Sequence, residues 1–122
     1  MNELIERLVA NVGVDRMTAE KALGIILDFL SKEGPPDNVQ ILLERMPGAE
    51  ALIAAARDDS GGGLLGGMGG VMGVGSRMMA AGLGMGQIQE ITRETIAYAR
   101  EKAGEDVVGK IVGAIPGLGQ FV

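Results

Sequence analysis

Residues 61–86 form a stretch in which glycine is interleaved with aliphatic residues and methionine. Nearly half of its positions are Gly, almost all the others are Leu, Met, Val or Ala, and Arg77 carries the only charge. A flexible tether stays hydrated through Ser and charged residues, whereas a segment this apolar makes a large exposed patch unless something covers it. We therefore predict that the rest of the chain covers this stretch, which is part loop and part buried helix.

The two parts of this stretch differ in glycine content. Each Gly in a helix interior costs roughly 1 kcal/mol relative to Ala, so residues 61–70 are predicted to be irregular. From Val71 to Leu83 the glycines thin out, and we expect an apolar helix packed between two helical halves, with Arg77 reaching solvent or a carboxylate. The side chains predicted to make core or interface contacts are Leu64, Leu65, Met68, Val71, Met72, Arg77, Met78 and Met79.

A membrane role for the same stretch is the second interpretation. Its length would suit a spanning helix, but Arg77 near the centre would cost roughly 2.5 to 3.5 kcal/mol on the insertion scale. Spanning is therefore disfavoured, and hydrophobic insertion into a membrane surface through residues 64–85 is kept as the alternative. The methionines of the stretch could in principle bind Cu(I), but without Cys or His we expect soft packing or an adaptable interface instead, and no cofactor.

Composition excludes many classes of function. The chain has no Cys and no His, which removes thiol nucleophiles, imidazole bases and the usual zinc ligands. The net charge is −5 and no basic run occurs, so nucleic-acid binding is not expected. Aromatic residues make up only 2% of the 122 residues, which favours a core of aliphatic side chains on helices. The N-terminus, with charges in its first turns, does not resemble a signal peptide, and a cytoplasmic location is the expectation.

Apolar residues recur at helical spacing along most of the chain. The pattern predicts an all-α protein: one compact bundle of five to six mostly short helices in a single domain, 1–122. Candidate N-caps are Asn2, Asp15 or Thr18, Asp37 and Asp106. The domain divides into a first helical unit (1–60), the Gly- and Met-rich crossover (61–86) and a second helical unit (87–122), with helical segments expected at about 2–12, 15–33, 37–46, 49–57, 71–83, 87–102 and 106–115.

The two helical units share a pattern. The segments "FLSKEGPPDNVQILLERMPGAEALI" and "YAREKAGEDVVGKIVGAIPGLGQFV" align when Pro47-Gly48 is placed on Pro116-Gly117, a displacement that we call the Pro-Gly offset. The alignment indicates pseudo-duplicated helix-turn-helix halves packed face to face. Chance similarity between short amphipathic helices that end in Pro-Gly is the other explanation. The residues matched at this offset are Phe29 with Tyr98, Val39 with Val108, Leu42 with Ile111, Leu43 with Val112, Met46 with Ile115, and Leu52 with Phe121.

The block "VGVDRMTAEKALGIILDFLSKEG … MPGAEALIAAA", the Gly-rich apolar middle and the ending "IPGLGQFV" resemble small bacterial helical proteins of unassigned function, the VcgC/VcgE-like and YidB-like families. The resemblance spans most of the chain and concerns pattern, not catalytic residues. It implies a helical fold and supplies no activity, ligand or site residue.

Two glycine motifs match nucleotide-binding patterns without their structural context. Residues 61–66, GGGLLG, fit G-x-G-x-x-G but follow Asp58-Asp59-Ser60, which is no strand. Residues 104–111, GEDVVGKI, fit G-x-x-x-x-G-K but place Ile111 where Ser or Thr would hold magnesium. A helix stop at Gly104 followed by a new helix explains the second motif better.

The functional prediction follows from missing catalytic groups and abundant apolar sequence. We expect a non-enzymatic interaction or scaffolding protein whose partner is another protein or, more specifically, a second copy of the chain. Peripheral lipid binding through residues 64–85 is the alternative. A small hydrolase or ligand carrier would require a pocket, and the paired carboxylates such as Glu90 and Glu94 have spacings typical of exposed helix faces.

Overall fold

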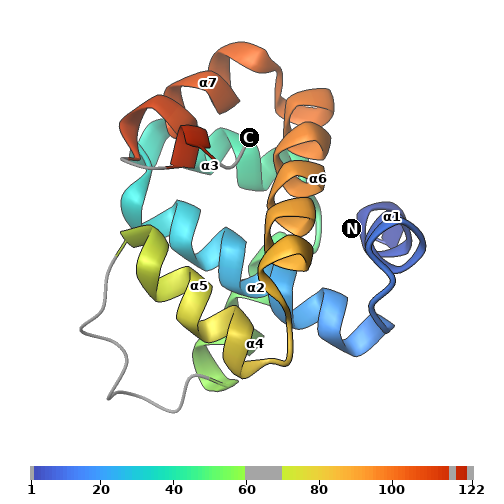
Figure 1. The fold of residues 1–122 in the computed structure, drawn as a ribbon. Coiled ribbons are helices and arrows are strands. Elements are labelled where there is room, and N and C mark those ends of the chain that lie inside the picture. The colour runs from blue at the N-terminus through green and yellow to red at the C-terminus, as the bar shows by residue number, and fades with distance from the viewer. Residues whose placement is uncertain (1, 60–69, 116–117, 121–122) are drawn as a thin grey trace.

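The computed structural model describes residues 2–59, 70–115 and 118–120 (Figure 1). These residues form seven α-helices and one short 3-10 turn and contain no strand, so the predicted all-helical class is confirmed. The seven helices outnumber the five or six expected for the bundle, but they correspond one to one to the seven segments in which apolar residues recur at helical spacing. The elements are α1 (Asn2–Val12), α2 (Arg16–Glu33), α3 (Pro36–Arg45), α4 (Ala49–Asp59), α5 (Gly70–Ala80), α6 (Met85–Ala103), α7 (Glu105–Ala114) and η1 (Leu118–Gln120).

Glycine and proline set the number of helices, because each break starts a new element instead of bending an old one. Gly104 has φ +92°, a conformation that favours glycine, and it separates α6 from α7 without a further linker residue. The pair Pro35-Pro36 separates α3 from α2, since Pro35 has no N–H to continue α2 and Pro36 begins α3. Five of the seven helices are consequently only 10 or 11 residues long.

One of the predicted helix caps agrees with the structure, and three differ from it. Asp15 caps α2, and its carboxylate accepts a hydrogen bond from the Thr18 N–H at 2.9 Å. The prediction that Asp37 and Asp106 are caps is wrong: both lie inside the first turns of α3 and α7, because Pro36 and Glu105 already begin these helices. There they still face the positive end of the helix dipole. Asn2 is itself the first residue of α1, and its side-chain oxygen accepts from Arg16 at 3.1 Å.

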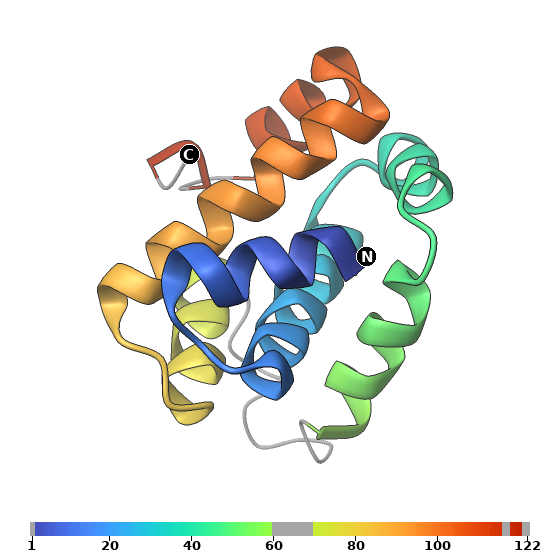
Figure 2. The same ribbon diagram turned by 90° about the vertical axis from the view of Figure 1, so that its right-hand side faces the viewer.

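The helix α2 is the centre of the fold. Every residue from Ala22 to Leu30 is buried, because α1, α3, α4, α5 and α6 all pack against it (Figures 1 and 2). A helix that is apolar on all sides is typical of such a central position. Its companion α6 is amphipathic, with Ile88, Ile91 and Ile96 in the core and charged residues outside.

The predicted apolar helix in the Gly- and Met-rich stretch is α5, which begins at Gly70 and ends at Ala80 instead of spanning 71–83. It ends early because Gly82 takes φ +96° and the Leu83 N–H turns back to the Met78 carbonyl at 3.2 Å. Met78 and Leu83, at the two ends of this turn, are both buried. The helix α5 contacts both α2 and α6, but it is buried on one side only, since Ser76, Met79 and Ala80 are exposed. The prediction of an irregular segment concerns residues that lie outside the described part, apart from Gly70.

The first helix is fixed to α6 by charge as well as by packing. Leu4, Ile5 and Leu8 of α1 are buried in the core. On the outside, the Arg7 guanidinium donates to the Glu101 carboxylate at 2.8 and 3.3 Å and lies over the Tyr98 ring, 5.5 Å from its centroid. The paired Arg7 lowers the pKa of the Glu101 carboxyl, and this contact ties the N-terminal helix to a residue 94 positions away.

Element boundaries recur at a fixed spacing along the chain. The helices α2 and α6, the helices α3 and α7, and the elements α4 and η1 all begin at positions separated by the Pro-Gly offset. Gly13 and Gly82, which both have positive φ, are separated by the same offset, and each follows a helix of 11 residues. The packing is reciprocal too: α1 lies on α6, α5 lies on α2, and α3 lies against α7.

Candidate functional site

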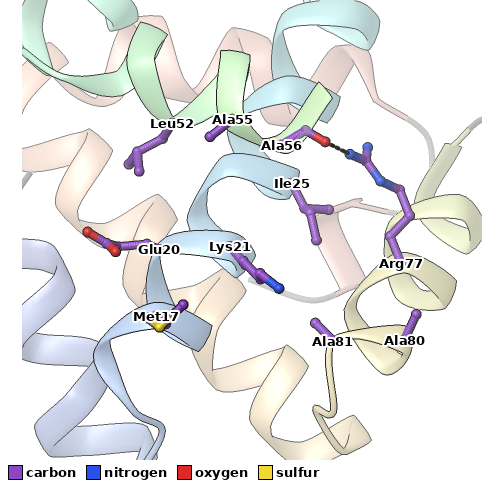
Figure 3. A pocket seen from close by; sticks show the side chains of 10 residues that line it. All are labelled: Met17, Glu20, Lys21, Ile25, Leu52, Ala55, Ala56, Arg77, Ala80 and Ala81. Atoms are coloured by element: carbon purple, nitrogen blue, oxygen red, sulfur yellow. Dashed lines mark hydrogen bonds between the residues drawn. The ribbon is translucent and has the colours of Figure 1, made fainter. Parts of the chain in front are cut away.

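A groove of about 620 Å³ opens between α4 and α5, and α2 forms its floor (Figure 3). The helices α4 and α5 both pack on α2, so the space between them exposes the α2 residues that neither helix covers. Apolar side chains make up most of the lining, with Glu20, Lys21 and Arg77 as the charged members. The lining residues are Met17, Glu20, Lys21 and Ile25 from α2, Leu52, Ala55 and Ala56 from α4, and Arg77, Ala80 and Ala81 from α5 and the turn that follows it.

Close contact between α2 and α4 creates one wall of this groove. The backbones meet at Gly24, where an added Cβ would lie 2.4 Å from the Leu52 carbonyl oxygen and 3.0 Å from the Ala56 methyl group. Only glycine fits such an approach without displacing backbone. The small side chains Ala55 and Ala56 continue this wall and leave the groove open.

A buried carboxylate joins the three helices of the groove. Asp28 of α2 is only 1% exposed, and its Oδ1 accepts from Arg57 Nε of α4 at 2.7 Å. Its Oδ2 accepts from Arg77 Nη1 of α5 at 3.2 Å and lies 3.3 Å from Lys32 Nζ. A buried charge is tolerated when it is paired and hydrogen-bonded in this way. Asp28 therefore connects α2 to α4 and to α5.

The charge state of Asp28 follows from two opposed effects. Burial by itself raises the pKa of this carboxyl, but the hydrogen bonds from Arg57 and Arg77, together with the nearby Lys32 ammonium, outweigh burial and lower the pKa below its ordinary value. Asp28 is consequently ionised at neutral pH.

Arg77 bridges the two walls of the groove. Its side chain is 19% exposed, and while Nη1 binds Asp28, Nη2 donates to the Ala56 carbonyl of α4 at 3.2 Å (Figure 3). The residue was predicted to reach solvent or a carboxylate, and the structure gives it a carboxylate. One side chain of α5 thus contacts both α2 and α4.

The predicted contact residues separate into three groups. Met78 is fully buried in the core, whereas its neighbour Met79 is 51% exposed and lies outside the core. Val71 and Met72 belong to α5, but their side chains are not among those described. The predictions for Leu64, Leu65 and Met68 fall on residues that lie outside the described part of the chain.

Sequence reasoning missed several residues in and around the groove. Met17 is 70% exposed in the first turn of α2, and Met85 is 57% exposed in the first turn of α6. With Met79, they account for three of the five exposed large hydrophobic side chains of the described residues. The three methionines lie in the first turn of α2, the last turn of α5 and the first turn of α6. Asp28 had a visible signal, since it is the only charge in the run "ALGIILDFL".

Three other patterns that can mark a functional site concern metal ions, phosphate and membranes. Among the residues with described positions, no three Asp or Glu side chains gather where a metal ion could be held. Residues 104–111, which match a phosphate-loop pattern, follow the helix α6 instead of a strand and enter α7 directly. Within residues 2–59, 70–115 and 118–120, no helix is both long and apolar enough to cross a bilayer.

Comparison of the chain with protein-family models, with curated proteins and with solved structures found no match.

Proposed function

We propose that this chain is a non-enzymatic interaction protein that associates with a second copy of itself through the groove between α4 and α5. The observation that carries the proposal is the groove itself: an apolar surface of two helices and a helical floor, bordered by charged residues, in a chain without Cys or His. Grooves of this kind accept the apolar face of a helix. The preferred occupant is another copy because the chain itself carries exposed methionines, Met17, Met79 and Met85, that such a contact would bury.

The three exposed methionines support an adaptable contact. Met17 belongs to the groove, and Met79 and Met85 flank the turn between α5 and α6. Methionine side chains are unbranched and polarizable, so they fit partners of varied shape. In a monomer these side chains contact water, and burying them on association is favourable.

The finer architecture proposed is a duplicated unit. In this proposal the first unit is α1 to α4, and the second is α5, α6, α7 and η1, related by the Pro-Gly offset. The boundary of the second unit then lies at Gly70, not at residue 87, because α5 corresponds to α1. The reciprocal packing of α1 on α6 and of α5 on α2 supports this pseudo-twofold arrangement. Both units remain parts of one domain, 1–122.

A pair of adjacent alanines provides the test. Ala55 and Ala54 are both exposed on α4, but only Ala55 lines the groove. We expect the wild-type chain to show a concentration-dependent mass in sedimentation equilibrium and Ala55→Glu to remain at the mass of one chain. Ala54→Glu, the matched control, should associate like the wild type. A wild-type chain that stays monomeric at high micromolar concentration would refute the proposal.

The expected location, the family resemblance and the membrane alternative bear on the same proposal. A cytoplasmic location and the resemblance to small bacterial helical proteins of unassigned function agree with it but add no partner. Insertion into a membrane surface through residues 64–85 is the competing outcome, although Met78 and Leu83 are buried in the protein core and are thus unable to contact lipid. Flotation with neutral vesicles distinguishes the two: a self-associating protein stays at the bottom of the gradient.

A further inference from the structure

The contacts between residues 2–59 and residues 70–120 are reciprocal. The first helix of each part lies on the long helix of the other, α1 on α6 and α5 on α2, and the short helices α3 and α7 lie against each other. Figure 1 shows α3 and α7 together at one end of the molecule and α5 beside α2 at the other. Along the chain, the two parts are joined only through residues 60–69.

The α1–α6 pair and the α5–α2 pair each cross, and each is joined by an arginine–carboxylate contact. At the α1–α6 crossing, Arg7 Nη1 lies 2.8 Å from Glu101 Oε2. At the α5–α2 crossing, Arg77 Nη1 lies 3.2 Å from Asp28 Oδ2. In both contacts the arginine belongs to the first helix of one part and the carboxylate to the long helix of the other part.

We propose that two chains exchange these parts and form a closed dimer, in which residues 2–59 of one chain pack against residues 70–120 of the other. The contacts that join the two parts within one chain can also form between two chains, and no additional contact surface is needed. Exchange therefore has a low free-energy cost. Linkage in one chain gives the monomer a high effective concentration, so the dimer forms when chains fold together at high concentration. This inference goes beyond the proposed function, because the exchanged dimer forms without the groove.

Charge reversal at the exposed crossing tests the exchange. The Arg7 and Glu101 side chains are both partly accessible, so substitution leaves the apolar core intact. An Arg7→Glu chain has two acids at the α1–α6 crossing, and a Glu101→Arg chain has two bases. If the two chains exchange parts with each other, both crossings of the mixed dimer regain opposite charges.

The experiment is to unfold the two variants in urea, mix them in equal amounts and refold them together at high concentration. We expect a species of twice the 12.6 kDa chain mass that contains both variants. Its yield should exceed that of either variant refolded alone by about tenfold at low salt, since two like-charged pairs become opposite pairs. The advantage should fall in 1 M NaCl. The chain with both substitutions, which restores an opposite pair within one molecule, should refold like the wild type.

Two outcomes separate this inference from the proposed function. If the mixture contains only single-chain species, or dimers without preference for the mixed pair, the exchange is overturned, while association of the wild type through the groove can still stand. To test independence from the groove, Ala55→Glu is added to both variants: the exchanged dimer should form as before. Loss of the mixed dimer in that background would contradict exchange as its origin.

Discussion

Arg77 and Asp28 lie 49 residues apart in the sequence, and a guanidinium nitrogen of the first is 3.2 Å from a carboxylate oxygen of the second. The same carboxylate accepts from Arg57 at 2.7 Å. Asp28 therefore adds a polar connection from α2 to both α4 and α5, beside the apolar packing of these helices. Since the three helices form the groove, one ionised side chain links its floor to both of its walls.

Replacing Asp28 by Asn should destabilise the protein strongly. The substitution removes the negative charge that Arg77, Arg57 and Lys32 share. Arg57 and Lys32 are more than half exposed and can turn to water, whereas Arg77 is mostly buried. We expect a loss of about 3 kcal/mol in the free energy of unfolding, the lower end of the range for breaking a buried ion pair. Urea denaturation measures it, and the exposed Glu44→Gln provides the control, with a change below about 0.5 kcal/mol.

Acid should destabilise the protein in part through Asp28. Its pKa in the folded state is lower than in the unfolded chain, so its contribution to stability is fully present above the unfolded value and is lost as the pH falls through the folded value. The free energy of unfolding should decrease from about pH 4 downward, near the ordinary pKa of Asp. Asp28→Asn should have a shallower dependence over this range. Equal slopes for the two proteins in urea titrations from pH 7 to pH 2 would contradict this assignment.

Local sequence patterns were sufficient for the long helices. The spacing of apolar residues predicted a helix from Asp15 or Thr18 to Glu33, and the structure has Arg16–Glu33. The prediction of 87–102 likewise matches Met85–Ala103 closely. Both helices are amphipathic or apolar over four turns or more and end at glycine, so neighbouring residues contain the information that fixes them.

The groove could not be predicted, because it depends on contacts between distant residues. Asp28 was visible as a lone acid in an apolar run, but its two arginine partners are 29 and 49 residues away and no local rule pairs them with it. Gly24 resembles any helix glycine until Leu52 is placed against it. The sequence does not indicate the proposed correspondence of α1 with α5, since the Pro-Gly offset aligns Leu4 and Leu8 of α1 with Gly73 and Arg77.

The adjacent methionines Met78 and Met79 should respond differently to truncation. Met78 is fully buried against the core, and Met79 is 51% exposed. We expect Met78→Ala to cost about 2 to 4 kcal/mol, as for other large-to-small core substitutions, and Met79→Ala to change the free energy of unfolding by less than about 0.5 kcal/mol. Thermal and urea unfolding of both variants measure the difference. Similar losses of unfolding free energy at the two positions would contradict the assignment of Met78, and not Met79, to the core side of α5.

Two helical glycines should give opposite effects when replaced by alanine. At Gly24 the new methyl group would meet the Leu52 carbonyl oxygen at 2.4 Å, so α4 must move away from α2, and we expect a loss of about 2 kcal/mol, as for overpacking a core. At Gly109, inside α7, nothing lies within 4 Å of the added Cβ. Gly109→Ala should therefore stabilise the protein by about 0.5 to 1 kcal/mol through helix propensity alone. Urea denaturation of the two variants tests both signs.

Because displacement of α4 widens the groove, Gly24→Ala should also weaken self-association in sedimentation, an effect that Gly109→Ala must not show. If Gly24→Ala were as stable as the wild type, the close approach of α2 and α4 would be refuted, and with it the wall on which the groove depends.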